Sequence, residues 1–147
     1  MDPTVHSHNL FYWFFRHSDK NAPVVIWLNG GPGATSMFGL FLENGPIRVK
    51  KSGPGIDDFV ITSPEQGSWA DTYNMIYIDQ PVGTGFSYGD TYLTDMQEGA
   101  DEFLTFLREF YLKYPELKAN KLFLTGESYA GKYLPLFTTK VLEWNEK

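Results

Sequence analysis

Apolar residues along the chain fall into runs whose spacing predicts strands in some segments and helices in others. Two runs rich in β-branched and aromatic residues, 10–15 and 24–28, flank the polar stretch RHSDKNAP and predict two antiparallel strands joined by a turn. The apolar runs 75–78 and 121–125 predict two further strands. Upstream of the third strand the pattern is irregular, with at most a short strand near 59–62. We expect the four main strands to lie in one sheet, with the last two parallel.

Helical spacing marks three segments. Residues 36–43 predict a short helix that is ended by the following tripeptide NGP. A longer helix is expected from Thr94, which has capping-box spacing with Gln97, to a stop before Pro115. Another helix contains Pro135, which is expected to kink it or to mark its first regular turn. The apolar positions expected on one face are Met96, Ala100, Phe103, Leu104, Leu107, Phe110 and Tyr111 in the first long helix and Tyr133, Phe137, Val141 and Trp144 in the second.

The order strand, helix, strand, helix predicts an α/β protein with a mixed, mostly parallel sheet and flanking helices. A chain of 147 residues that is 42% hydrophobic is long enough for one core and too short for two ordinary domains. We therefore expect a single domain over residues 1–147. Glycine-rich loops follow two of the predicted strands directly, NGGPG at 29–33 and DQPVGTGFSYGD at 79–90.

Charge and cysteine content exclude several classes of function. The net charge of −6 argues against nucleic-acid binding, which needs clustered Lys and Arg. No apolar run approaches the length of a membrane span, and the first residues, MDPTVHSHN, lack the basic flank and apolar core of a signal peptide. The absence of cysteine excludes disulfides, thiolate metal ligands and cysteine nucleophiles.

The stretch LTGESYAGKY places Ser128 between a predicted strand and a predicted helix. A serine on a tight strand-to-helix turn presents its hydroxyl clear of the backbone, and such a turn needs small neighbours, here Gly126, Ala130 and Gly131. The alternative is a serine that caps the following helix. A nucleophilic serine also needs backbone N–H groups for a tetrahedral oxyanion, and the NGGPG loop after an earlier strand can supply one. The two features together favour an acyl-transfer site.

Four motifs occur in order along the chain: WLNGGPG at 27–33, ENGP at 43–46, YIDQPVGTGFSY at 77–88 and GESYAGKYLP at 126–135. From about residue 9 to the end of the chain, the sequence resembles the serine carboxypeptidase family, α/β-hydrolases that remove single residues from peptide C-termini. The resemblance implies a partial α/β-hydrolase fold, hydrolysis of C-terminal peptide bonds through an acyl-enzyme, and no metal or cofactor. It also implies a lysosomal, vacuolar or secreted location.

Residue by residue, the resemblance implies that Ser128 is the nucleophile and that the N–H groups of Gly31 and Tyr129 form the oxyanion hole. The residues that it implies bind the terminal carboxylate of the peptide substrate are Trp27, Asn29, Gly30 and Glu127. A glutamate beside a bound carboxylate has to be protonated to avoid repulsion, so the pair shares a proton and favours acidic pH. The residues of the second glycine-rich loop that are interpreted as scaffold near the site are Asp79, Gly83 and Gly85.

The sequence departs from the family in two ways. Ala34 stands where family members commonly carry a cysteine, so a disulfide-stapled form is not expected. In α/β-hydrolases the Asp and His of the triad follow the serine, and only residues 129–147 follow Ser128. The histidines all precede it and are expected to be ordinary surface groups: they are His6, His8 and His17. We therefore interpret 1–147 as the N-terminal, incomplete part of a hydrolase domain whose remainder supplies the Asp and the His.

Two alternatives to a peptidase remain open. A carboxypeptidase-like acyltransferase would pass the acyl group to an alcohol, but Glu127 favours the peptidase because the transferase branch tends to carry Asp there. A non-catalytic, truncated hydrolase acting as a structural or binding subunit fits the missing Asp and His, although the other functional positions are intact.

For a truncated sheet, the edge beside 121–125 should be unpaired, and an exposed apolar patch should include Phe123, Tyr133 or Phe137.

Overall fold

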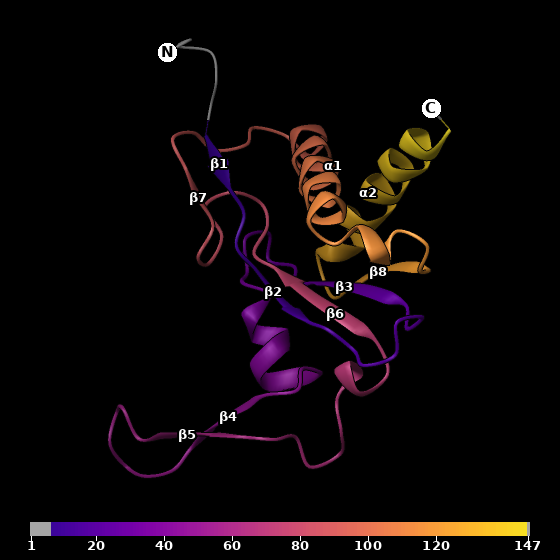
Figure 1. Ribbon diagram of the computed structural model, residues 1–147. Coiled ribbons are helices and arrows are strands. Elements are labelled where there is room, and N and C mark those ends of the chain that lie inside the picture. Colours follow the sequence, from indigo (N-terminus) through magenta and orange to yellow (C-terminus); the bar gives the residue numbers. More distant parts are fainter. Residues whose placement is uncertain (1–6, 147) are drawn as a thin grey trace.

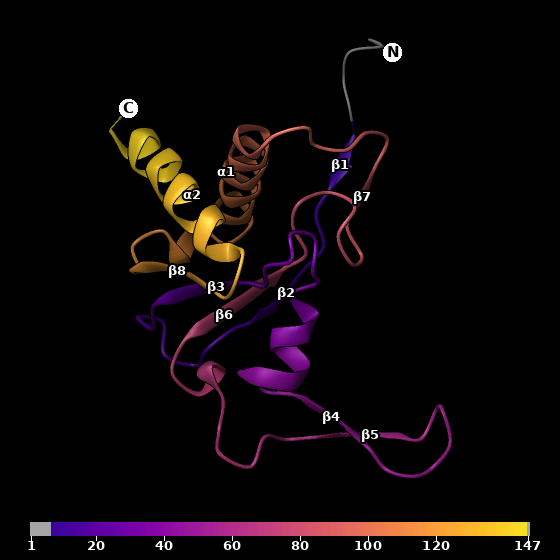
Figure 2. The ribbon, with the colours of Figure 1, turned by 180° about the vertical axis from the view of Figure 1, so that it is seen from behind.

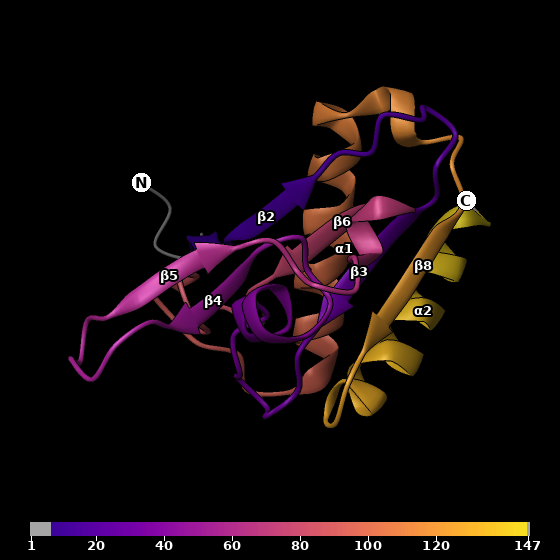
Figure 3. The ribbon, with the colours of Figure 1, turned by 90° about the horizontal axis from the view of Figure 1, so that it is seen from below.

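The computed structural model describes residues 7–146, and its centre is a four-stranded sheet in the order β2–β6–β3–β8. The strands are β2 (Tyr12–Phe15), β3 (Val24–Leu28), β6 (Asn74–Ile78) and β8 (Leu122–Gly126). β3 pairs in parallel with β6 on one side and with β8 on the other, whereas β2 pairs antiparallel with β6. Figure 3 shows the four strands side by side. The mixed, mostly parallel sheet that the sequence predicts is confirmed.

One expected connection is wrong, because β2 and β3 are not joined as a paired hairpin. Their directions are antiparallel, but β6 lies between them. Every residue of β3 and of β6 is buried, which requires a partner on both sides of each strand and cover on both faces. β2 is only partly buried and takes an edge of the sheet.

Helices cover both faces of the sheet. The helices α1 (Met96–Lys113) and α2 (Ala130–Asn145) lie together on one face, and a π-helix, Gly39–Glu43, lies on the other (Figures 1 and 2). Short 3₁₀ turns span Trp69–Asp71 and Pro115–Leu117. No helix among residues 7–146 combines the length and the apolar content needed to cross a membrane.

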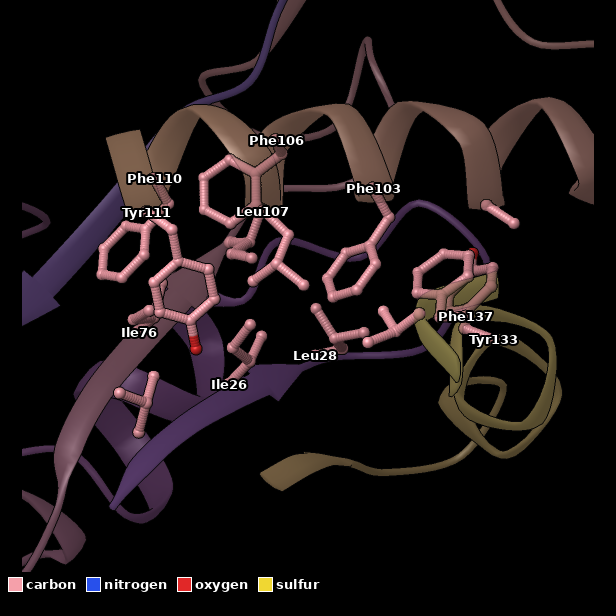
Figure 4. Close-up of a cluster of buried hydrophobic side chains, with 14 of the residues drawn as sticks. Ile26, Leu28, Ile76, Phe103, Phe106, Leu107, Phe110, Tyr111, Tyr133 and Phe137 are labelled. Atoms are coloured by element: carbon pink, nitrogen blue, oxygen red, sulfur yellow. The ribbon is translucent and has the colours of Figure 1, made fainter. Parts of the chain in front are cut away.

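The main core lies between the sheet and the two long helices (Figure 4). Its buried members include Ile26, Leu28 and Ile76 from the sheet, Phe103, Leu107 and Phe110 from α1, and Tyr133 and Phe137 from α2. Successive side chains of a strand point to opposite faces, so the alternate residues of β3 belong to a second cluster. There Val25 and Trp27 pack with Met37 and Leu40 on the side of the π-helix.

The apolar pattern predicted for α1 is confirmed with two differences. Phe106 is also buried in the core, because the apolar face of a helix covering a sheet is wider than the predicted positions. The helix is capped by Asp95, whose side chain accepts a hydrogen bond from Glu98 N at 2.9 Å, and not by the Thr94–Gln97 pair. Asp95 has the extended backbone that an N-cap requires. α2 runs unbroken through Pro135.

Two small antiparallel strand pairs lie outside the central sheet. β4 (Arg48–Lys51) and β5 (Phe59–Thr62) form a hairpin that projects from the body of the molecule (Figures 1 and 3). The sequence predicts β5 but not β4, whose residues RVKK are largely polar. β1 (His8–Asn9) pairs with β7 (Tyr88–Gly89).

β8 forms an open edge of the sheet, because within residues 7–146 it pairs with β3 alone. Phe123 on this strand is 48% exposed and lines a groove of about 610 Å³ together with Leu142 and Trp144 of α2. Of the three aromatic residues named as candidates for an exposed patch, Phe123 is exposed, whereas Tyr133 and Phe137 are not. Both rings are buried, because they stack on each other and Phe137 stacks on a ring of α1.

Phe123→Lys should reduce self-association of the chain, because a charge on an open strand edge opposes edge-to-edge pairing. In sedimentation velocity over a concentration series, the wild-type chain should form oligomers, and the variant should shift several-fold toward monomer. Ile56→Lys is the matched control, because Ile56 is 86% exposed between β4 and β5, away from β8. A wild-type chain that stays monomeric at high concentration would contradict the prediction.

Candidate active site

Ser128 lies on the turn between β8 and α2 in a backbone conformation that few residues with a side chain adopt. Its φ is 56°, and it is the one non-glycine residue with a positive φ in the described chain. Such a conformation stores about 1–3 kcal/mol of strain and persists only where the surrounding structure imposes it. α2 begins at Ala130 with Tyr129 as its N-cap and without a side-chain cap. The alternative interpretation of Ser128 as a helix-capping serine is therefore wrong.

The turn is crowded on one side of Ser128 and open on the other. A Cβ at position 126 would lie 2.3 Å from the carbonyl oxygen of Leu28 and 2.7 Å from the methyl group of Ala130, so only glycine fits. A Cβ at position 131 would meet nothing within 4 Å. The expected need for small neighbours thus applies to Gly126 and the buried Ala130, and it is wrong for Gly131.

The NGGPG loop lies directly against the serine turn. A Cβ on Gly30 would lie 2.5 Å from Tyr129 N and 3.0 Å from Ser128 Cβ, so this close approach requires glycine. The N–H groups of Gly31 and Tyr129 donate no hydrogen bond to any residue in the described part of the chain. Two unpaired N–H groups on adjoining segments beside one serine can bind a single oxyanion.

Asn29 connects this loop to Glu127. Its side-chain Oδ1 accepts hydrogen bonds from Trp27 Nε1 at 2.8 Å and from Gly39 N at 3.1 Å. The amide nitrogen Nδ2 then donates to Glu127 Oε1 at 2.8 Å. Because Asn29 is buried, these bonds fix which way its amide points. The residues that the sequence predicts for carboxylate binding therefore lie together: Trp27, Asn29, Gly30 and Glu127.

Glu43, the last residue of the π-helix, adds a second carboxyl group to this cluster. Burial raises the pKa of Glu43, and the charge of Glu127 and a hydrogen bond with it raise that pKa further. Two carboxyl groups can share a hydrogen bond only when one of them is protonated. The sequence predictions missed Glu43, although it opens the ENGP motif. The available signal was an acidic residue at the end of an otherwise apolar helical segment.

Asp79 holds the two glycine-rich loops together. Its carboxylate is completely buried and accepts hydrogen bonds from Thr35 Oγ1 at 2.6 Å, Ser36 N at 2.9 Å and Phe86 N at 3.0 Å. Ser36 Oγ in turn accepts a hydrogen bond from Asn29 N at 3.1 Å. Asp79 is thus linked to the carboxylate cluster through one residue and does not face Glu127 itself. This geometry is that of a scaffold residue.

The described histidines contact other parts of the fold. His17 is half-buried, and its Nε2 lies 3.2 Å from the carbonyl oxygen of Asp71. His8 is half-buried, with Nδ1 at 2.9 Å from Glu102 Oε1 and Nε2 at 3.0 Å from Thr91 Oγ1. The expectation of an ordinary surface group is therefore wrong for His8, because β1 packs against the start of α1. His6 lies outside the described residues.

A cavity of about 1080 Å³ lies beside α1 and is lined by His8, Tyr12 and Glu102. None of its lining residues belongs to the serine turn, to the NGGPG loop or to the carboxyl pair. The candidate chemistry is therefore located at the end of the central strands and not in this cavity.

Asp79→Ala should lower the free energy of unfolding by about 3 kcal/mol or more, because it leaves the N–H groups of Ser36 and Phe86 without their acceptor. Equilibrium urea unfolding measures the effect. Asp57→Ala is the control, since Asp57 is exposed beside β5 and should change the value by less than about 0.5 kcal/mol. Equal effects of the two substitutions would show that Asp79 does not hold the loops.

Glu43→Gln should stabilise the chain at neutral pH and have little effect near pH 4. The folded chain raises the pKa of Glu43, so stability falls as the pH rises from the ordinary glutamate pKa toward the raised one. Glutamine removes this loss because it does not ionise. Calorimetric melting temperatures of wild type and variant at both pH values test the sign. Glu109→Gln, on the exposed face of α1, is the control, and a lower melting temperature of Glu43→Gln at neutral pH would contradict the prediction.

The similarity of this chain to known proteins covers nearly all of its residues. The sequence model of the serine carboxypeptidase family matches residues 2–147. The chain is 43% identical to a probable serine carboxypeptidase CPVL of Dictyostelium discoideum and 44% identical to a venom serine carboxypeptidase of Apis mellifera, over 97% and 95% of its length. It covers only 28% and 29% of those proteins.

A solved structure of similar fold is that of KEX1(DELTA)P, a prohormone-processing carboxypeptidase from Saccharomyces cerevisiae. Its TM-score is 0.82 at 34% identity, and the match covers 99% of this chain and 31% of the other. The chain thus spans less than a third of the length of the proteins it matches. Because sequence and fold agree over almost all of its residues, the protein belongs to the serine carboxypeptidase family.

Proposed function

We propose that this chain carries the nucleophile, the oxyanion hole and the carboxylate site of a serine-type carboxypeptidase. Ser128 Oγ attacks the carbonyl carbon of the last peptide bond, a C–O bond forms, and the C–N bond breaks to release the C-terminal residue. The serine proton passes through a base to the leaving amine, and water then hydrolyses the acyl-enzyme. The N–H groups of Gly31 and Tyr129 bind the developing oxyanion. The close approach of Gly30 to Ser128 and Tyr129 carries this proposal, because Gly31 is the next residue of the same loop.

The carboxyl cluster supports a preference for a free peptide C-terminus. Asn29 donates its amide N–H to Glu127, and Glu127 lies close enough to Glu43 to raise the pKa of that residue. A proton held by this pair can be donated to a substrate carboxylate, whereas a fully ionised pair would repel it. Because the pKa of Glu43 is raised, Glu43 keeps its proton to a higher pH than an ordinary glutamate and loses it as the pH rises further. Peptide binding is therefore expected to be strongest under acidic conditions.

The general base is expected from a C-terminal part of the hydrolase domain that supplies an Asp and a His. No described histidine contacts Ser128, and a serine hydroxyl without a base is a poor nucleophile. Residues 1–147 alone should therefore lack peptidase activity at an enzymatic rate. We use the term completed enzyme for residues 1–147 joined to that C-terminal part.

Since one relative is a venom carboxypeptidase and others process pheromones, a secretory or lysosomal compartment is proposed for the completed enzyme.

In the completed enzyme, Ser128→Ala should lower turnover by several orders of magnitude and spare peptide binding. Glu127→Gln should weaken the preference for acidic pH, because a neutral amide can donate to the substrate carboxylate without first taking up a proton. The assay is release of the free C-terminal amino acid from a blocked dipeptide between pH 4 and 8. Thr138→Ser, on the exposed side of α2, is the control for a substitution outside the site.

The same assay separates the alternatives. Transfer of the acyl group to an added alcohol that far exceeds hydrolysis would support the acyltransferase. A folded completed enzyme that is inert, with no change on Ser128→Ala, would support a structural or binding subunit. Activity of residues 1–147 alone at the rate of the completed enzyme would contradict the assignment of the base to the C-terminal part.

A further inference from the structure

Arg48, the first residue of β4, directs its guanidinium group back to the end of the π-helix. Nη1 donates hydrogen bonds to the carbonyl oxygens of Gly45 at 2.7 Å and Ile47 at 3.3 Å, and Nη2 donates to the carbonyl oxygen of Glu43. A longer contact of 3.5 Å reaches the carbonyl oxygen of Leu40. No carboxylate among residues 7–146 forms an ion pair with Arg48. The donors of this arginine are therefore directed to the main chain.

These contacts act on the backbone of Glu43. Carbonyl groups at the C-terminal end of a helix lack partners within the helix and carry a partial negative charge, which a cation stabilises. Arg48 binds the carbonyl oxygen of Glu43, while the carboxyl group of the same residue lies against Glu127. By holding the backbone of Glu43, Arg48 thus fixes where the side chain of this residue starts.

Among the described residues, Arg48 forms no ion pair with Glu43 or with Glu127. A guanidinium group in contact with a carboxylate lowers the pKa of that carboxylate and would remove the shared proton. Instead, burial and Glu127 are the influences on the pKa of Glu43, and both raise it. Because Arg48 binds carbonyl oxygens, it can support Glu43 and leave the proton in place.

The turn after the π-helix has further hydrogen bonds, none of which is made by Arg48. Asn44 N donates to the carbonyl oxygen of Gly39 at 3.0 Å, and the carbonyl oxygen of Asn44 accepts from Trp69 N at 3.0 Å. Asn44 Oδ1 accepts a hydrogen bond from the hydroxyl of Tyr77 at 2.8 Å. Burial raises the pKa of Tyr77 by more than the charge of Arg48 lowers it, so this hydroxyl stays a donor. Loss of Arg48 should therefore leave the turn folded and allow Glu43 to move.

We infer that Arg48 is a positioning residue for recognition of the substrate's C-terminal carboxylate, because it holds Glu43 against Glu127 without neutralising either group. The inference rests on the proposed function, since it assigns a role within the proposed carboxylate site. Its signature is a selective effect on substrates with a free terminal carboxylate. A peptide with a C-terminal amide does not need the shared proton and should be insensitive to Arg48.

The test uses the completed enzyme carrying Ser128→Ala, so that binding is measured without turnover. Dissociation constants of a blocked dipeptide and of its C-terminal amide are determined by calorimetry from pH 4 to 8. The preference for the free acid is the ratio of the dissociation constant of the amide to that of the acid. Arg48→Met should reduce this ratio about tenfold near pH 4, which is ~1.4 kcal/mol. It should also lower the pH at which the preference falls to half its maximum. Arg48→Lys should restore part of the preference, because an ammonium group can still bind a carbonyl oxygen. Arg108→Met is the matched control, since Arg108 lies on α1 over Trp144.

A folded Arg48→Met variant with an unchanged preference and an unchanged pH midpoint would overturn the inference. If Arg48→Met does not fold, Arg48→Leu decides in its place: a folded leucine variant with a weakened preference supports the role, and one with the full wild-type preference overturns it. Hydrolysis by the enzyme with Ser128 intact is measured in parallel. If hydrolysis does not depend on Ser128, the proposed function is overturned. If hydrolysis depends on Ser128 but Arg48→Met keeps the wild-type preference for the free acid, only the role of Arg48 is overturned.

Discussion

Parallel pairing of β3 with β8, in the register that sets Leu28 beside Gly126, determines where the candidate residues lie. The carboxyl ends of parallel strands meet at one edge of a sheet, so the NGGPG loop and the serine turn leave the sheet next to each other. The hydrogen bond from Glu127 N to the carbonyl oxygen of Leu28, 3.2 Å long, continues this pairing into the turn. A shift of register by one residue would separate Gly30 from Ser128 and Asn29 from Glu127.

Three acidic residues at this edge have different roles because their surroundings differ. Asp79 is buried among N–H and O–H donors, so its carboxylate serves as an acceptor that ties one loop to the other. Glu43 and Glu127 face each other, and neither is paired with a cation in the described chain. Burial and the neighbouring Glu127 raise the pKa of Glu43, so this residue takes up a proton more readily than an ordinary glutamate. Ser36 links the two arrangements through its backbone N–H and its hydroxyl.

Most of what the sequence predicts correctly depends on short-range pattern. The buried strands β3, β6 and β8 and the apolar face of α1 have distinctive spacing, and the glycines around Ser128 and in the NGGPG loop mark both turns. The missed features depend on contacts between distant parts of the chain. They include the place of β6 beside β2, the proximity of Glu43 to Glu127, and the burial of His8 against Glu102. The pattern of neighbouring residues in the sequence is the same for a surface glutamate or histidine as for one that a distant part of the chain covers.

The hydrogen bond between Asn29 and Glu127 joins positions that are 98 residues apart, and this separation affects how the chain is made. On the ribosome, β3 and the NGGPG loop emerge long before β8, so during this interval β3 has no strand on its outer side. Its residues VVIWL are apolar and β-prone, the composition of a segment that pairs with other chains when it is exposed. The pairing that gives the site its geometry therefore leaves one side of β3 without a partner strand in the nascent chain until β8 arrives.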